Sequence, residues 1–552
     1  MRRIIPVFAA LLLGLTGLNA QNKIEKVALT YGAELPDDKF KIIKIIGEAN
    51  SKIYALATKK DDFTLKIYES GSMKQISSHE IVLPKMDDKD VDFEDIFLLN
   101  GKLYAVGSVY NRKTKIFNLV GTPVSDKGEL SKNGTILFDA EVEKKNKRGN
   151  FYFEQSQDES ALLVMHTCLF KKEDAVKYEV KLFDENLKTL FANSEKVTFD
   201  DSKKDYEFTI ADFDINYRDD VFLVINESYR DKKQKEKVER FEVHAFKQAN
   251  NYAKEIINIA FKDKEIINCK MMSNSKGMLQ LAGFYSSVRE NGKANKDLKG
   301  VYNATIDLAT NANTNLKFNE FDYATKVKLL GERRAKKGKD VKPVYTITTL
   351  IEKEDGGMII LSEYQLVVVG QSQGIGPLAF TPVTYIMNEI IITSLKPDGS
   401  LEWGNVLAKD QNATVTTMSF SLGALFGGGG GSFAVGIAAN IPLTELGKGP
   451  EYLGAIPIYK NGELNILIND NVKNKGITDI EEIKTLGNYN KAVPSLFIFD
   501  KTGKITRKDP EEVIKNELVI RPGVFYRKNS KEYIVYSSRK KQDKLGRMVL
   551  ED

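Results

Sequence analysis

Apolar and polar positions follow one pattern that recurs eight times along the chain. Each copy has an apolar hairpin with a tight polar turn, then an alternating strand, a second tight turn and a short fourth strand. The second strands of the hairpins begin at Ile53, Leu103, Leu162, Val221, Met278, Met358, Leu464 and Tyr533. These starts are separated by 50, 59, 59, 57, 80, 106 and 69 residues, which indicates a repeat with late insertions.

The turns within the units carry residues that suit tight antiparallel connections. Asn100-Gly101 and Asn461-Gly462 are typical of two-residue hairpin turns, and Asp398-Gly399 follows a third strand. A unit of this kind is a four-stranded antiparallel blade, which cannot bury both of its faces alone. The sequence therefore predicts an all-β fold, a single β-propeller of eight blades, with seven as the alternative.

The last unit has only three clear strands, the third ending at 547–550. The early strand Ile24–Thr30 has a matching apolar pattern and is available to complete that blade. Pairing of the two ends would remove an open sheet edge. We therefore expect residues 24–30 to close the ring and residues 21–552 to form one domain.

Four long insertions interrupt the later units, at 324–342, 364–388, 411–456 and 472–493. All follow second or fourth strands, and in an antiparallel blade both connections emerge on the same face of the ring. Segment 324–342 is rich in Lys and Arg and is expected to form a helix that packs through Tyr323, Val327 and Leu330. In segment 472–493 a short helix is expected over 479–486, with Thr478 as its N-cap.

Two of these insertions contain long uncharged runs, and 411–444 is expected to be a protruding apolar ribbon or a flexible loop. Apolar loops of this size mark contact with a protein, a membrane surface or an apolar ligand, unless they cover one another. The basic helix is either a solvated face or a partner-binding patch. The candidate partner-contact residues are Leu378, Phe380, Leu422, Leu425, Phe426, Phe433, Val435, Arg333, Arg334, Lys336 and Lys337.

Residues 1–20 have the pattern of a secretory signal peptide. Arg2 and Arg3 precede an apolar stretch, and a small residue, Ala20, stands at the expected cleavage position. This predicts that the protein is exported and then either stays in the periplasm or associates with the outer membrane. The signal contains no Cys, so we expect no lipid anchor there.

Neither the charge balance nor the Cys and His residues indicate a specific binding site. The chain of 552 residues has 81 Lys+Arg and 76 Asp+Glu, a balance that gives no reason to expect nucleic acid as a partner. Cys168 and Cys269 fall in different units and are expected to be buried free thiols. The three His residues fall in different units with no shared spacing, so no metal site and no cofactor is predicted.

The segment 394–403, Ser-Leu-Lys-Pro-Asp-Gly-Ser-Leu-Glu-Trp, resembles the outer-strand motif of secreted bacterial propellers. These include quinoprotein-type repeats and the envelope-assembly propellers. A related version, Phe-Asp-Lys-Thr-Gly-Lys-Ile, stands at 499–505. The resemblance implies repeat architecture and carries no catalytic residue over.

The sequence thus favours a non-catalytic, extracytoplasmic binding protein that contacts a cell-envelope protein or surface component through its insertion-bearing face. Two alternatives place the activity at the axial mouth of the propeller. One is a glycan-active hydrolase or lyase that uses acids of the inner strands, and the other is a glycan-binding module. An axial pocket lined by several carboxylates would favour the enzyme, whereas a mouth filled by apolar side chains would exclude it.

Overall fold

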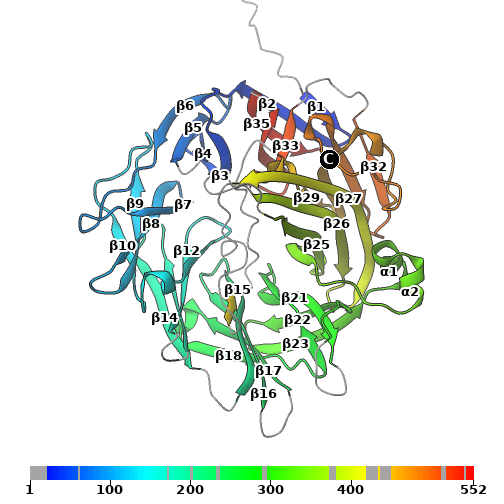
Figure 1. Ribbon diagram of the computed structural model, residues 1–552, viewed down its shortest axis with the longest axis horizontal. Helices are drawn as coiled ribbons and strands as arrows, with labels where there is room; N and C mark the ends of the chain where they lie inside the picture. The colour runs from blue at the N-terminus through cyan, green and yellow to red at the C-terminus, as the bar shows by residue number, and fades with distance from the viewer. Residues whose placement is uncertain are drawn as a thin grey trace, which may run out of the picture.

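The computed structural model describes residues 21–59, 62–170, 173, 175–198, 203–231, 237–288, 295–371, 381–417, 433–435, 449–510, 518–539 and 542–551. The described strands form eight sheets arranged around a common centre (Figure 1). The predicted all-β propeller is confirmed. Sequential strands within each blade pair antiparallel, and the first strands of the blades, such as β3, β15 and β33, lie nearest the centre.

The strands of the first four blades are, in order, β3 (Lys41–Ala49), β4 (Lys52–Lys59), β5 (Asp62–Glu69) and β6 (Gln75–Glu80); β7 (Asp92–Leu99), β8 (Lys102–Asn111), β9 (Ile116–Val124) and β10 (Thr135–Glu141); β11 (Asn150–Gln155), β12 (Leu162–Phe170), β13 (Ala175–Phe183) and β14 (Thr189–Thr198); and β15 (Lys203–Ile215), β16 (Val221–Asp231), β17 (Lys237–Phe246) and β18 (Lys254–Asn258). The next three blades contain β19 (Lys264–Ile266), β20 (Lys270–Ser273), β21 (Met278–Ser287), β22 (Gly300–Asp307) and β23 (Ala312–Glu320); β24 (Tyr345–Glu352), β25 (Met358–Val369), β26 (Thr381–Leu395) and β27 (Leu401–Thr417); and β29 (Ala455–Lys460), β30 (Glu463–Asn471), β31 (Ala492–Phe499) and β32 (Ile505–Lys508).

Both ends of the described chain meet in the remaining sheet. It contains β33 (Val519–Arg527), β34 (Glu532–Arg539) and β35 (Gln542–Leu550), followed by β2 (Val27–Glu34) and β1 (Gln21–Ile24). The pairing of β2 with β35 runs from Val27 opposite Leu550, so the strand expected at 24–30 closes this blade from Val27 onward. Ile24 belongs to β1, an additional outermost strand that folds back on β2.

Hydrophobic cores lie between neighbouring blades, because each blade is apolar on both faces. Along β12, Leu162 and Val164 pack toward the second blade, whereas Leu163 and Met165 pack toward the fourth. Side chains alternate between the two faces of a strand, so one strand contributes to two cores. This explains why β12 is almost continuously buried instead of alternating between buried and exposed positions.

The motif at 394–403 also connects two blades. The ring of Trp403, on β27, stacks on Phe499 of the next blade with centroids 6.3 Å apart and planes within 5°. Gly503, in the turn after β31, has φ of +79°, and an added Cβ would lie 2.5 Å from the Trp403 ring. A glycine is needed there for both reasons.

Two features of the insertions differ from expectation. The basic segment forms two helices, α1 (Tyr323–Leu330) and α2 (Glu332–Lys336), because Gly331 interrupts it with φ of +76°. The helix expected over 479–486 is absent, and that segment is a turn in which Asp479 accepts a hydrogen bond from the Glu481 amide at 2.9 Å. The Asn474 side chain holds this segment in a non-helical conformation, because it donates to the Lys484 carbonyl at 2.8 Å and accepts from the Lys484 amide at 2.7 Å.

None of the helices among the described residues is long and apolar enough to span a membrane.

Candidate functional site

The basic patch predicted on the insertion-bearing face lies on α2 and the residues that follow it. Arg333, Arg334, Lys336 and Lys337 are all exposed. Lys336 pairs with Glu332 one turn earlier at 2.7 Å, and within the described chain the other three have no acidic partner. The patch therefore presents mostly uncompensated positive charge to solvent.

The helix beneath this patch packs only partly as expected: Leu330 contacts the core between the fifth and sixth blades, but Tyr323 does not face inward. Tyr323 is 52% exposed, whereas Thr325 and Lys326 are buried. Asp322 caps the helix by accepting from the Thr325 amide at 2.7 Å. The buried Lys326 ammonium pairs with Glu320 at 2.8 Å and with Asp340 at 3.5 Å. Lys326 therefore points inward because acids before and after the two helices pair with it, although the spacing of apolar residues along the segment predicts that another face is buried.

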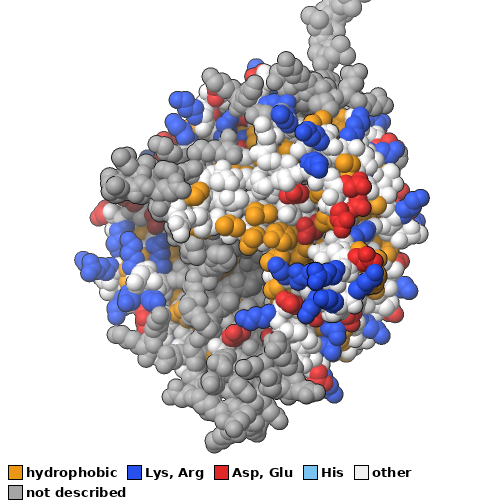
Figure 2. Space-filling view, turned by 45° about the vertical axis from the view of Figure 1, so that its right-hand side comes forward, with side chains coloured by type: hydrophobic (Ala, Val, Ile, Leu, Met, Phe, Trp, Pro, Cys, Tyr) orange, Lys and Arg blue, Asp and Glu red, His pale blue; other side chains and the backbone are white. Residues whose placement is uncertain are grey.

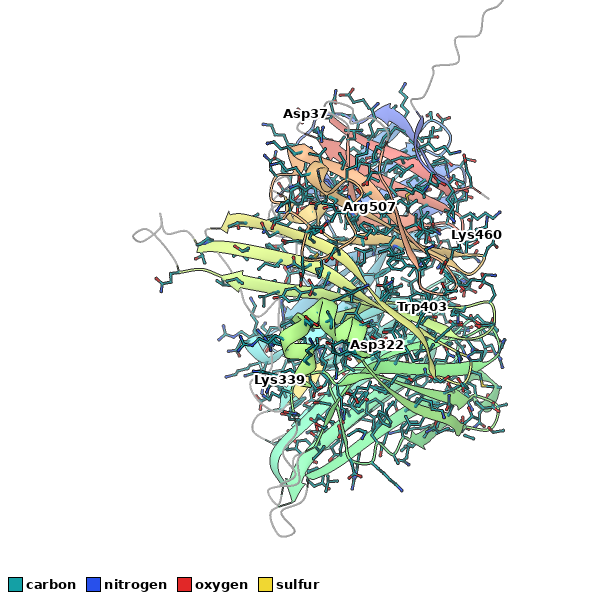
Figure 3. The ribbon with its side chains drawn as sticks, turned by 90° about the vertical axis from the view of Figure 1, so that its right-hand side faces the viewer. Asp37, Asp322, Lys339, Trp403, Lys460 and Arg507 are labelled. Atoms are coloured by element: carbon teal, nitrogen blue, oxygen red, sulfur yellow. The ribbon has the colours of Figure 1, made fainter. Side chains whose placement is uncertain are left out.

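The second candidate surface is an extension of β25, β26 and β27 beyond the rest of their blade. β24 begins at Tyr345, opposite Tyr364, so no described strand pairs with residues 366–369 on the β24 side of β25. Pairing between β25 and β26 nevertheless continues to Val369 opposite Val383, and β27 continues alongside to Thr417. Figure 3 shows these strands projecting past the body of the propeller, on the side of Lys339 and away from Lys460. We call residues 365–369, 381–388 and 410–417 the ribbon.

The two faces of the ribbon have different environments. On one face, Val383, Tyr385 and Val415 are buried in a core with residues that include Tyr452, Leu486 and Tyr489. On the other face, Leu366 is 37% and Val368 is 45% exposed. Val369, at the end of the strand, is 37% exposed. The ribbon is therefore fixed from one side and presents apolar side chains from the other.

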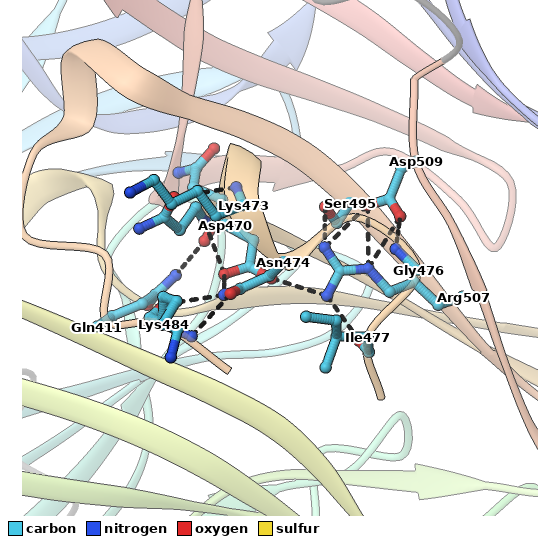
Figure 4. A network of polar contacts seen from close by, with 12 residues as sticks. Gln411, Asp470, Lys473, Asn474, Gly476, Ile477, Lys484, Ser495, Arg507 and Asp509 are labelled. Atoms are coloured by element: carbon cyan, nitrogen blue, oxygen red, sulfur yellow. Dashed lines mark hydrogen bonds and ion pairs between the residues drawn. The ribbon is translucent and has the colours of Figure 1, made fainter. Parts of the chain in front are cut away.

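A buried polar network holds the segment that covers the ribbon (Figure 4). Arg507 is its centre, with a side chain only 1% exposed, and it pairs with Asp470 and Asp509, both at 2.9 Å. Its guanidinium also donates to the Ile477 carbonyl at 2.9 Å. Asn474 donates to the Lys484 carbonyl at 2.8 Å, and Leu486 donates its amide to the Asp410 carbonyl of the ribbon.

The remaining predicted contact residues are distributed as follows. Leu378, Phe380, Leu422, Leu425 and Phe426 lie outside the described residues. Phe433 and Val435 are in β28 (Phe433–Val435), which pairs in parallel with β15 of the fourth blade. That strand of the 411–456 insertion lies against an inner strand of the ring. Within the described part of this insertion, the segment that protrudes is 411–417, which belongs to the ribbon.

An axial cavity of about 1160 Å³ lies among the first strands of the later blades. Its lining includes Tyr217, Glu352, Glu354, Tyr459 and Phe525. Residues of the turns between first and second strands take part, so the cavity reaches the face opposite the insertions. The described lining includes the carboxylates of Glu352, Glu354 and Glu363, so it is not the purely apolar filling that would exclude the glycan-active enzyme.

Three acids of the inner strands β11 and β15 interact with one another. Surrounding protein removes much of the bulk water near the solvent-accessible carboxyl of Glu154 and raises its pKa to about 7, and the negative charge of Asp212 adds to the shift. Burial, followed by the charges of Glu154 and Asp212, raises the pKa of Asp214 well above its usual value. Lys270, 4.0 Å from Asp212, opposes these shifts. The structure thus brings together acids from two blades that sequence reasoning left unpaired.

The repeat itself contains a signal for this cluster. Glu154 and Lys270 each stand eight residues before the start of the second strand of their blade, at Leu162 and Met278. Asp212 and Asp214 stand nine and seven residues before Val221. Aligning the units by register would have placed all four at the same level of the ring.

Cysteine and histidine show no reactive arrangement in the described parts. Cys168 and Cys269 are buried free thiols, as expected. Burial raises the pKa of the Cys168 thiol to about 12. No group of three or more His, Cys, Asp or Glu side chains in the described residues is placed to hold a metal ion.

No protein-family model and no curated protein matches the chain. Among solved structures, the Dos1 propeller is similar over 95% of both chains, with 9% identity and a TM-score of 0.37. The β-propeller domain of the trilobed protease from Pyrococcus furiosus matches 69% of this chain and 97% of its own, with 10% identity and a TM-score of 0.30. The GH93 α-L-arabinofuranosidase of Fusarium graminearum matches 70% and 90%, with 10% identity and a TM-score of 0.28. We draw nothing about activity from these similarities.

Proposed function

We propose that the protein is a non-catalytic, extracytoplasmic binding protein that contacts a cell-envelope protein or surface component through its insertion-bearing face. The observation that carries the proposal is the exposed apolar end of β25. Leu366, Val368 and Val369 are three of the ten large hydrophobic side chains that are most exposed among the described residues. The others, such as Ile76, are dispersed over several strands, loops and a helix, and dispersed apolar residues are normal on a surface.

The position of the ribbon supports binding. Its buried face is anchored through Tyr385 and Val415, so its exposed face is presented in a fixed conformation. A preformed surface loses less conformational freedom on binding than a loop does. Within the described chain, no strand pairs with the β24-side edge of 366–369, and an edge of this kind can pair with an extended segment of a partner.

The adjacent charge suggests the chemistry of the partner. Figure 2 shows an apolar patch directly beside a group of Lys and Arg side chains, on the side that brings α1 and α2 forward. Arg333, Arg334 and Lys337 supply exposed cations next to the blade that carries the ribbon. We infer a partner surface that is apolar at its centre and acidic at its rim.

A comparative binding experiment tests the proposal. The purified protein is immobilised and exposed to solubilised cell envelope, and the retained component is then purified and titrated against three variants. The ribbon variant carries L366S, V368S and V369S, and the charge variant carries R333E, R334E and K337E. A matched control carries I76S, I136S and I256S, which replace side chains on outer strands that are at least as exposed as those of the ribbon.

We expect the ribbon variant to weaken binding by at least about tenfold and the control to bind normally. The charge variant should mainly lower the association rate constant. Added salt should reduce the difference in this rate constant between the charge variant and the unmodified protein. Equal retention by the ribbon variant and the control would refute the proposal.

A further inference from the structure

A separate inference concerns the axial cavity, which the proposed binding face does not use. Its volume of about 1160 Å³ exceeds the roughly 300–1,000 Å³ of most small-molecule sites, so it has room for a ligand of several rings. First strands from several blades form its wall, and these strands are fixed by hydrogen bonding within their sheets. The cavity is therefore a preformed site.

Aromatic rings from three blades line the cavity. Tyr459 lies on β29, Phe525 on β33, and Tyr217 in the turn after β15. Tyr459 is positioned by donating its hydroxyl to Glu354 at 2.7 Å, and Phe525 is positioned by contact with the Tyr533 ring at a centroid distance of 5.9 Å. Tyr217 is 54% exposed. Flat apolar faces of this kind stack on rings whose C–H groups point outward.

Hydroxyl and carboxylate groups lie between the aromatic rings. Thr348 is exposed in the lining, where its hydroxyl donates to the Leu361 carbonyl at 3.3 Å and can still accept a hydrogen bond. Glu352 accepts from the Ser275 hydroxyl at 2.7 Å and has remaining acceptor capacity. A lipid chain has no group that could replace the hydration of the Glu352 and Glu354 carboxylates in this lining, so it would leave their desolvation uncompensated.

The charges of the lining disfavour an anionic ligand. Glu352 and Glu354 face the cavity, and Glu363 pairs there with the buried Lys409 at 2.7 Å. The cation Lys353 is already neutralised by Glu402 at 2.7 Å, and the other cation of the described lining, Arg527, donates to the Asn529 carbonyl at 3.4 Å. Phosphate and sulfate groups would thus meet excess negative charge.

We propose that the axial cavity binds a short neutral oligosaccharide. Such a chain combines apolar ring faces for Tyr217, Tyr459 and Phe525 with hydroxyl groups for Thr348 and Glu352. It carries no charge that the lining would repel. The site takes its ligand from the hairpin-turn face, opposite the ribbon.

Isothermal titration calorimetry with defined probes tests the site. The probes are malto-, cello-, xylo-, arabino- and chito-oligosaccharides, with oligogalacturonate as an anionic probe and oligolysine as a cationic peptide probe. The variants are Y459A, F525A and Y217A, and Y459F is a matched control that keeps the ring. Y217A changes a half-exposed side chain and so keeps the test valid if a more buried variant fails to fold.

We expect at least one neutral oligosaccharide to bind, oligogalacturonate to bind more weakly, and each alanine variant to weaken binding about tenfold, equivalent to about 1.4 kcal/mol. The Y459F variant should retain most of the affinity, and the ribbon variant should bind as the unmodified protein does. Binding of oligolysine alone, absence of binding to every neutral probe, or unchanged affinity in all folded alanine variants would overturn the proposal.

Discussion

Closure of the ring by β2 should make residues 21–34 essential for stability. Deleting them removes β1 and β2 and exposes the edge of β35. A shorter deletion, of residues 21–23, is the matched control. It removes only part of the outermost strand, where Lys23 has a side chain 52% exposed.

The magnitude follows from what β2 buries. Val27, Leu29 and Tyr31 are 3%, 7% and 7% exposed. Full burial of each such side chain contributes about 1.5–3 kcal/mol, so their loss costs about 5–9 kcal/mol. The hydrogen bond between Tyr31 and Ser537, at 3.1 Å, is also lost. Because a folded domain is stable by only about 5–15 kcal/mol, the longer deletion should remove most of the stability.

Denaturant unfolding of the two truncated proteins and the untruncated protein would measure this difference. We expect the midpoint to change little for the 21–23 deletion and to fall steeply for the 21–34 deletion. Hydrogen exchange should also accelerate in β35 and β34. Superimposable unfolding curves for both deletions would show that β2 does not hold the ring closed.

Three further predictions concern buried polar groups. Arg507→Met should destabilise the fold by about 3–5 kcal/mol in denaturant unfolding, because it leaves the buried Asp470 carboxylate without its cation. Lys508→Met, at a more exposed position, is the control and should change the unfolding free energy little. Equal effects of the two substitutions would contradict the role of Arg507. Burial alone would raise the pKa of Glu48, but hydrogen bonds from Arg547 and Ser70 hold it at about 2. Its contribution to stability should be present above pH 4.5 and be lost as the pH falls through about 2, a dependence that the Glu48→Gln variant should lack and that unfolding across this pH range would measure. Cys168, with its pKa raised by burial, should react with a thiol reagent near neutral pH only after unfolding, and fast labelling of the native protein would contradict its burial.

The architecture is readable from the sequence because it depends on local signals that repeat. Asn100-Gly101 and Asn461-Gly462 adopt the positive φ values that their turns require, and the alternation between them specifies the strands. The closing strand at 24–30 was recognised from its pattern and from the missing strand of the last unit. The sequence does not indicate that the strand starts at Val27, because the ends of a strand depend on the residues it pairs with.

The site was less predictable because it depends on contacts between distant segments. The inward position of Lys326 depends on Glu320 and Asp340, which a helical periodicity does not include. Segment 364–388 was identified as an uncharged insertion, but its β-branched residues Val367, Val368 and Val369 indicated strands, which the loop interpretation overlooked. Glu154 and Asp214 meet only because neighbouring blades place equivalent positions side by side.

Site-specific photo-crosslinking in the native cell tests the proposed binding face most directly. A photoreactive amino acid is placed at Val368 in the ribbon or, as the control, at Ile136 on β10, which is 53% exposed. The account predicts a discrete adduct with an envelope component from position 368 and none from position 136. The same adducts from both positions, or none from position 368, would contradict it.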